Sequence, residues 1–140
     1  SLMKIVAETL IKLGTERAMV IHSADGMDEI SIYDKTHVIE INNSEMNSYE
    51  IDPRDYFTCN STIADIKVND SEQSLEMMLS VIKNKDTPAR MIALLNAAAL
   101  VYISGKSETI SDAVKICENA LKSKNVDIKV NELIRLTNSF

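Results

Sequence analysis

The stretch AMVIHSADGMDE, residues 18–29, decides how this 140-residue chain is interpreted. Its first four residues, Ala18 to Ile21, form a compact apolar run with two β-branched members. Polar and turn-forming residues follow at Ser23, Asp25 and Gly26, so the pattern predicts a buried strand that ends in a loop. Ligands collect beyond the carboxyl ends of strands in α/β sheets, and we therefore expect the functional residues of the chain in this loop.

The loop carries three carboxylates within five residues, at Asp25, Asp28 and Glu29. Carboxylates this close repel one another unless water or a cation neutralises them. Mg²⁺ is a natural candidate, because it takes one or two carboxylates and completes its shell with water and phosphate oxygens. The alternative is an exposed acidic turn that holds no ion, and the residues alone favour this simpler interpretation.

A helix is expected before the strand and further strands after it. Apolar residues recur at helical spacing up to Gly14, which suits the left-handed residue that ends a helix. These residues are Leu2, Ile5, Val6, Leu10 and Leu13. Apolar residues in 30–33, 38–41 and 46–51 predict three short strands, at least some of them antiparallel because their connections are too short for a parallel crossover. Residues 52–68 follow no regular period and predict a surface loop.

The second half of the chain predicts helices over 75–82, 91–103, 110–121 and 128–134, because its apolar residues recur at helical spacing. The helix over 91–103 is apolar nearly all round, so we expect it to be buried on most sides. Asn96 is the exception within it, and an unpaired buried amide costs about 1 to 3 kcal/mol. We therefore expect Asn96 to bind a nearby backbone group.

Local signals mark where two of these helices begin. Asp70 and Gln73 stand in the positions of a capping box ahead of the first helix. Thr87 and Pro88 stand as N-cap and first residue of the second.

Composition excludes several classes of protein. Hydrophobic residues make up 45% of the chain and charged residues 26%, with three glycines and two prolines, which is typical of one globular domain. The net charge of −6 opposes binding to nucleic acid. No apolar run approaches the roughly 20 residues of a membrane span. Two distant cysteines, Cys59 and Cys117, indicate neither a disulfide framework nor a zinc site, so we expect a cytoplasmic protein.

Three stretches, in this order, resemble segments of anthranilate phosphoribosyltransferases. In residues 10–33 a helix ending in Leu-Gly precedes a strand, a histidine and an Asp-Gly-Met-Asp-Glu turn. Residues 52–57 read DPRDYF, and residues 95–99 read LNAAA with Gly105-Lys106 behind them. Ser23 departs from the pattern, since the family usually has glycine there, and a serine fits if its backbone φ is negative.

The resemblance implies an α/β fold: a fragment of the phosphoribosyltransferase and nucleoside phosphorylase-like α/β domain, with a short mixed sheet flanked by about five helices. Residues 1–140 would be the C-terminal portion of that domain, without the upstream helical domain and the glycine-rich phosphate loop. The implied activity transfers phosphoribosyl from phosphoribosyl pyrophosphate to anthranilate in tryptophan biosynthesis. In that family the paired acids of the turn bind Mg²⁺, and here they are Asp28 and Glu29.

The resemblance also implies a homodimer for the full-length protein and an inactive fragment, because no glycine-rich loop and no anthranilate-binding residues are found here. The alternative is a non-catalytic binding or oligomerisation module that reuses the fold. A nucleoside phosphorylase is disfavoured, because it gives no reason for the Asp-Glu pair. A structural hydrogen bond is the expected role of His22, and shaping of the turn is the expected role of Asp25.

Overall fold

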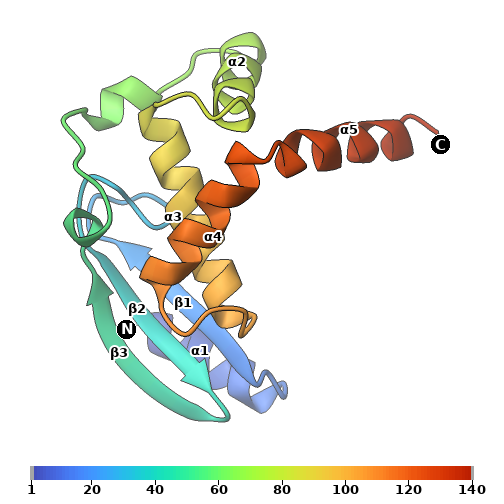
Figure 1. The fold of residues 1–140 in the computed structure, drawn as a ribbon. Coiled ribbons are helices and arrows are strands. Elements are labelled where there is room, and N and C mark those ends of the chain that lie inside the picture. The colour runs from blue at the N-terminus through green and yellow to red at the C-terminus, as the bar shows by residue number, and fades with distance from the viewer. Residues whose placement is uncertain (1, 140) are drawn as a thin grey trace.

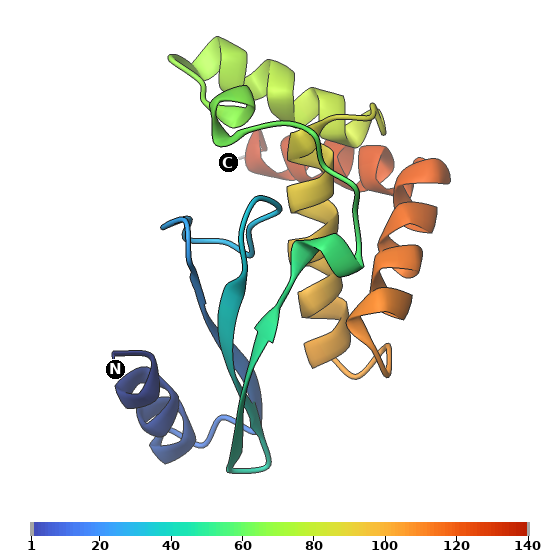
Figure 2. The same ribbon diagram turned by 90° about the vertical axis from the view of Figure 1, so that its left-hand side faces the viewer.

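A computed structural model describes residues 2–139 and has three layers (Figures 1 and 2). A three-stranded sheet lies between helix α1 on one face and helices α3 and α4 on the other, with α2 and α5 beyond one end of the sheet. The elements in chain order are α1 (Leu2–Lys12), β1 (Arg17–Ser23), β2 (Thr36–Asn42), β3 (Glu45–Ile51), the 3₁₀ segments η1 (Pro53–Asp55) and η2 (Ile63–Ile66), α2 (Ser71–Ile82), α3 (Pro88–Ile103), α4 (Ile110–Lys122) and α5 (Asn125–Thr137).

The sheet has the strand order β1-β2-β3, and both neighbouring pairs are antiparallel. Val20 of β1, Ile39 of β2 and Ser48 of β3 form one cross-strand row. Asn43 and Ser44 connect β2 to β3 with positive φ angles of 50° and 70°, the conformation of a tight hairpin turn. The α/β fold with five helices is confirmed. Every strand pair within residues 2–139 is antiparallel, so the parallel pairing that a mixed sheet requires is not among them.

The strand predicted over residues 30–33 is wrong. Ile30 and Ile32 are buried, as their apolar character indicated, but the segment is a loop. The Ile30 N–H donates to Oδ1 of Asn96 at 2.9 Å, and the Ser31 N–H donates to Oγ1 of Thr36 at 3.2 Å. Because side chains satisfy these backbone groups, the segment does not need a neighbouring strand.

The main core lies between the sheet and the pair α3 and α4. On the sheet side it contains Val38 and Ile51, and the loop adds Ile30 and Ile32. The helices contribute Leu94, Leu95, Ala98, Ala99, Ile110, Ala113, Val114, Cys117 and Leu121. The apolar face predicted for 110–121 is therefore confirmed. Helix α3 is fully buried at Leu94, Leu95, Ala98 and Ala99 and partly buried elsewhere, except at Leu100, which is 72% exposed.

The apolar faces of α1 and α5 point largely into solvent. Of the stripe predicted on α1, Leu2, Ile5, Val6 and Leu13 are exposed, while Ala7 is the buried residue of this helix. Helix α5 has no buried residue over Asn125–Thr137. Exposed apolar faces of this kind are typical of surfaces that bind another element or another protein.

The predicted helix starts are confirmed in hydrogen-bond detail. The Asp70 carboxylate accepts from the Gln73 N–H at 2.8 Å, and the Thr87 hydroxyl accepts from the Arg90 N–H at 3.3 Å. These caps satisfy backbone donors that have no partner inside the helix. Among residues 2–139, no helix combines the length and the apolar character needed to cross a membrane.

Candidate metal-binding site

The acidic turn lies where the sequence predicted it, directly after β1 at one end of the sheet. The Ala24 N–H donates to the Lys35 carbonyl at 2.9 Å, which extends the pairing of β1 and β2 by one step and fixes the base of the loop. Asp28 and Glu29 are both exposed. Within the described residues neither carboxylate takes part in a hydrogen bond or an ion pair, in contrast to Asp25. Both acids are therefore available to a cation.

Asp25 shapes the turn and does not join the exposed pair. Its Oδ1 accepts from the Met27 N–H at 3.1 Å, and its Oδ2 accepts from the Ser31 hydroxyl at 2.5 Å. Burial raises the pKa of Asp25, but the hydrogen bonds from Ser31 and Met27 lower it further, and the net pKa lies below its ordinary value of 3.8. Gly26 follows with a φ of +85°, which suits the residue without a side chain. The expected role of Asp25 in the turn is confirmed.

Asn96 of α3 fixes the other end of the turn. Its Nδ2 donates to the Ile30 carbonyl at 2.9 Å, and its Oδ1 accepts from the Ile30 N–H at 2.9 Å. The same Nδ2 donates to the Ile92 carbonyl one helical turn earlier, also at 2.9 Å. The expected backbone partner of Asn96 is thus Ile30, the residue next to Glu29. Sequence reasoning predicted a partner for Asn96 but not this link to the acid pair.

Buried hydroxyl groups stabilise the base of the turn, and the sequence analysis did not identify two of them, those of Ser31 and Thr36. Ser23, Ser31 and Thr36 are all buried, and Thr36 Oγ1 donates to Ser23 Oγ at 3.4 Å. Ser31 links this group to Asp25 and accepts from the Tyr33 N–H at 2.9 Å. A serine between two isoleucines was the available signal. Ser23 has no positive φ, which meets the condition for a serine at this position.

His22 does not contribute to the turn. Its side chain is exposed and makes no hydrogen bond within residues 2–139, so the expected structural bond is not found. Successive side chains of a strand alternate between faces, which places His22 on the face opposite to the buried Ser23. It pairs in register with His37, whose Nδ1 lies 3.2 Å from Oε1 of Glu50.

The turn lies between two hollows. Glu29 borders a hollow of about 420 Å³, whose lining is mainly apolar: Met27, Ile66, Met77, Ala89, Ile92, Ala93 and Asn96. Asp25 borders another of about 640 Å³, which also contains Lys35 and Arg54. Both cations are already engaged, Lys35 with Glu50 at 2.8 Å and Arg54 with Asp52. They leave the charge of Asp28 and Glu29 uncompensated.

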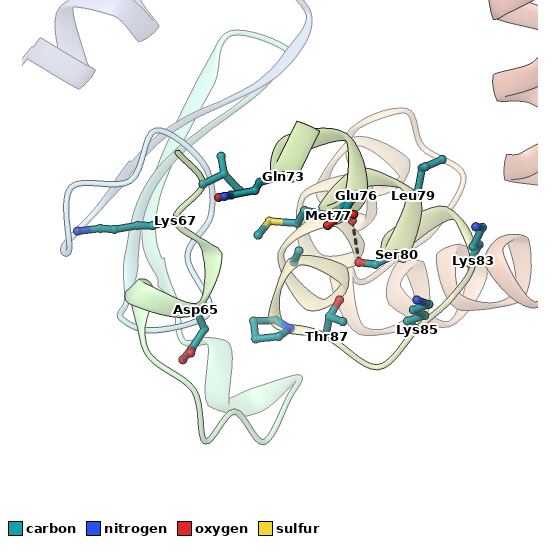
Figure 3. Close-up of a pocket in the computed structure, with 13 residues that line it drawn as sticks. Asp65, Lys67, Gln73, Glu76, Met77, Leu79, Ser80, Lys83, Lys85 and Thr87 are labelled. Carbon is teal, nitrogen blue, oxygen red and sulfur yellow. Dashed lines mark hydrogen bonds between the residues drawn. The ribbon is translucent and has the colours of Figure 1, made fainter. Parts of the chain in front are cut away.

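A larger groove of about 710 Å³ adjoins the hollow beside Glu29, with which it shares Met77 and Ala89 (Figure 3). It is formed by the segment around Asp65 and Lys67, by Gln73, Glu76 and Ser80 of α2, and by the start of α3 at Thr87. No residue of the acidic turn lines it, so it is not part of the candidate metal site.

The donor set fits magnesium better than metals that need a complete protein cage. Within residues 2–139, no group of three or more His, Cys, Asp or Glu side chains is placed to hold a metal. Structural zinc needs four protein ligands, and calcium takes six to eight oxygens. Mg²⁺ is commonly held by one or two carboxylates together with water and substrate phosphates. Asp28 and Glu29 meet that requirement.

Comparisons with known proteins agree with this architecture. The model of the glycosyl transferase family, α/β domain, matches residues 1–125. Anthranilate phosphoribosyltransferase from Nitrosomonas eutropha is 36% identical over 134 residues, covering 96% of this chain and 39% of its own length. The enzyme of the same name from a Marinomonas species is 39% identical, covering 96% of this chain and 40% of its own length. This chain therefore spans about two fifths of the curated relatives it matches.

Solved structures share the fold. The anthranilate phosphoribosyltransferase from Saccharomyces cerevisiae, in a complex with phosphoribosyl pyrophosphate and magnesium, superposes with a TM-score of 0.83 at 15% identity, covering 96% of this chain and 39% of that one. The enzyme from Thermus thermophilus superposes with a TM-score of 0.77 at 22% identity, covering 90% and 37%. Since the family model covers most of the sequence and the fold is the same, this chain belongs to the glycosyl transferase family through its α/β domain.

Proposed function

We propose that this chain is the metal-contacting part of an anthranilate phosphoribosyltransferase. The full-length protein would transfer phosphoribosyl from phosphoribosyl pyrophosphate to the amino group of anthranilate and release pyrophosphate, a step in tryptophan biosynthesis. The single observation that carries the proposal is the pair of unengaged carboxylates in the turn after β1, Asp28 and Glu29, in a chain whose curated relatives bear that name.

Two acidic residues of the turn would bind the cation, and other residues would fix the positions of these two. Asp28 and Glu29 supply two oxygen donors for Mg²⁺. When bound, Mg²⁺ offsets the negative charge that builds on the departing pyrophosphate. Asn96 fixes the backbone beside Glu29, and Asp25 closes the turn through Met27 and Ser31. A donor that is already in position costs no reorganisation when the leaving group departs.

Two carboxylates are too few for the whole reaction. We place residues 1–140 as the C-terminal portion of the α/β domain, with the phosphate loop, the anthranilate site and the helical domain on the three fifths of the relatives that have no counterpart here. Alone, the chain would be inactive. The complete protein would be a cytoplasmic homodimer that binds neither nucleic acid nor membrane.

The test is a fused protein in which the unmatched part of the N. eutropha enzyme precedes Leu2. Asp28→Asn or Glu29→Gln should lower its turnover by about 100-fold or more, the scale for loss of one preorganised electrostatic contact. Glu45→Gln is the matched control, because Glu45 is also an exposed carboxylate but lies at the opposite end of the sheet, beside the hairpin turn. The proposal is wrong if both acid variants keep the turnover and magnesium dependence of the unmodified fusion.

A second candidate function is a non-catalytic binding or oligomerisation module. The exposed apolar faces of α1 and α5 favour it, because such faces mark interaction surfaces. Under this alternative the fused protein would have no phosphoribosyl transfer activity, and the 140-residue chain would form a defined oligomer at micromolar concentration in sedimentation velocity.

A further inference from the structure

The two histidines of the chain are cross-strand neighbours on one face of the sheet. His22 of β1 and His37 of β2 are register partners, and the sequence contains no other histidine. Both side chains are exposed, whereas the next register pair, Ser23 and Thr36, is buried on the opposite face. Directly opposite residues on antiparallel strands have Cβ atoms about 4.5 to 5.5 Å apart. The two imidazole rings can therefore reach a shared ligand without any movement of the backbone.

Glu50 of β3 continues this row and contacts one of the two rings. It is the register partner of His37, and its Oε1 lies 3.2 Å from Nδ1 of that ring. Its other oxygen, Oε2, lies 2.8 Å from Nζ of Lys35. A proton on Nδ1 that faces the carboxylate leaves the lone pair of the neutral ring on Nε2, and histidines that bind metals usually have such a partner on the second nitrogen. The contact with Glu50 therefore favours the tautomer of His37 that binds a metal through Nε2.

Two imidazoles are ligands for transition metals rather than for magnesium. Imidazole suits Zn²⁺, Cu²⁺ and Ni²⁺, whereas Mg²⁺ takes oxygen ligands. Zinc binds each histidine nitrogen at about 2.0 to 2.1 Å, so a tetrahedral ion needs the two nitrogens about 3.3 Å apart, a separation that rings on opposite cross-strand positions can adopt. Water would fill the remaining positions, because residues 2–139 contain no group of three or more His, Cys, Asp or Glu side chains placed around one metal.

We propose that His22 and His37 form a second metal site, which binds one divalent transition metal ion such as Zn²⁺ between β1 and β2. The two imidazoles are its protein ligands, and Glu50 accepts the Nδ1 proton of His37. The site shares no ligand with the acid pair Asp28 and Glu29, and its nitrogen ligands select different ions. The inference is therefore independent of the proposed function, and either can fail without the other.

The position of the histidine site gives it an effect on the acidic turn. Two residues after His22, the Ala24 N–H donates to the Lys35 carbonyl at 2.9 Å, the last bond before the loop opens. An ion that joins β1 to β2 beside this bond opposes its opening. At a zinc concentration ten times the dissociation constant, hydrogen exchange of the Ala24 amide should slow by about 10-fold, because the open form lacks the paired ligands. Unchanged exchange in the zinc-bound chain would overturn the bridge between the strands.

Calorimetric titration of the 140-residue chain with zinc chloride measures the site directly. Excess magnesium chloride is present to occupy the acidic turn, and all proteins carry Cys59→Ser, because Cys59 is the partly exposed thiol. We expect one zinc ion per chain. His22→Ala and His37→Ala should each weaken binding by about 100-fold or more, and Glu50→Gln by about 10-fold, the lower end of the range for loss of a group that orients a ligand. Unchanged affinity in either histidine variant would overturn the proposal, and so would loss of binding in Asp28→Asn.

A variant that keeps two histidines but separates them tests the importance of register. His37→Ala combined with Glu45→His moves the second histidine to the hairpin end of the sheet, where Glu45 is exposed and pairs with Asn42. This protein should bind zinc as weakly as His37→Ala alone, and recovered affinity would mean that any two surface histidines suffice. Sedimentation velocity should give the same oligomeric state with and without zinc. An increase in size that depends on zinc would show that the ion joins two copies, and it would overturn the proposal.

Discussion

Replacing Asn96 by alanine should destabilise the chain more than its single amide group suggests. The substitution leaves the N–H and the carbonyl of Ile30 without their partners, and Ile30 is 1% exposed. Each buried group left unpaired costs about 1 to 3 kcal/mol, and water that enters beside the loop recovers part of this. Alanine regains up to about 0.7 kcal/mol of helix propensity. The net loss in free energy of unfolding should be about 2 to 3 kcal/mol, a large part of the roughly 5 to 15 kcal/mol that holds a domain folded.

Urea unfolding followed by circular dichroism measures this loss. With a urea dependence of about 1 to 3 kcal/mol per molar, the midpoint should fall by about 0.7 to 3 M. Asn131→Ala is the matched control: it has the same propensity gain and loses one exposed hydrogen bond, from Nδ2 to the Asp127 carbonyl. Its midpoint should move by less than about 0.5 M. If Asn96→Ala shifts the midpoint no more than Asn131→Ala, the reasoning that joins α3 to the acidic turn is refuted.

Three further predictions concern single contacts. Because the pKa of Asp25 in the folded protein lies below its ordinary value, the ionised carboxylate contributes stability above pH 3.8, and this contribution is lost as the pH falls through the lower folded pKa. The difference in stability between the unmodified chain and Asp25→Asn should therefore disappear in acid. Urea midpoints measured across a pH series test this, and a difference of constant size would contradict it. The hydroxyls of Tyr49 and Tyr102 both donate to Glu40, at 2.8 and 2.9 Å. Tyr49→Phe and Tyr102→Phe should each lower the free energy of unfolding by about 1 kcal/mol, and in a double-mutant cycle the two effects should be non-additive. Additive effects would mean that the two hydrogen bonds act independently. Thr87→Ala should lower the thermal midpoint, because it removes about 1 kcal/mol of capping stability at the start of α3. Thr87→Ser keeps a hydroxyl and should retain most of that stability. Equal midpoints for the two variants would show that the hydroxyl does not cap the helix.

Features set by neighbours in sequence were predictable. The starts of α2 and α3 depend on Asp70 with Gln73 and on Thr87 with Pro88, which lie within one helical turn of each other. The acidic turn was predictable for the same reason, since an apolar run and Gly26 mark its limits. That Asp28 and Glu29 bind a metal remains a prediction.

Features set by distant contacts were not predictable. Residues 30–33 have the apolar alternation of a strand, but the partner of Ile30 is Asn96, 66 residues away. Alternation indicated burial correctly and could not indicate which group takes the backbone hydrogen bonds. The apolar stripe on α1 was predicted, but the sequence could not indicate which element or partner packs against it. An apolar stripe predicts that a partner exists and does not identify that partner.

The two anchors of the acidic turn bear on how such a loop can vary between proteins. Its first residues are tied to the sheet through Ala24, and its last through Asn96 at Ile30. Asp28 and Glu29 adjoin the second fastening, so their position is inherited from α3. Exchanges earlier in the loop are constrained separately, by the hydrogen bonds of Asp25 to Met27 and Ser31 and by the positive φ of Gly26.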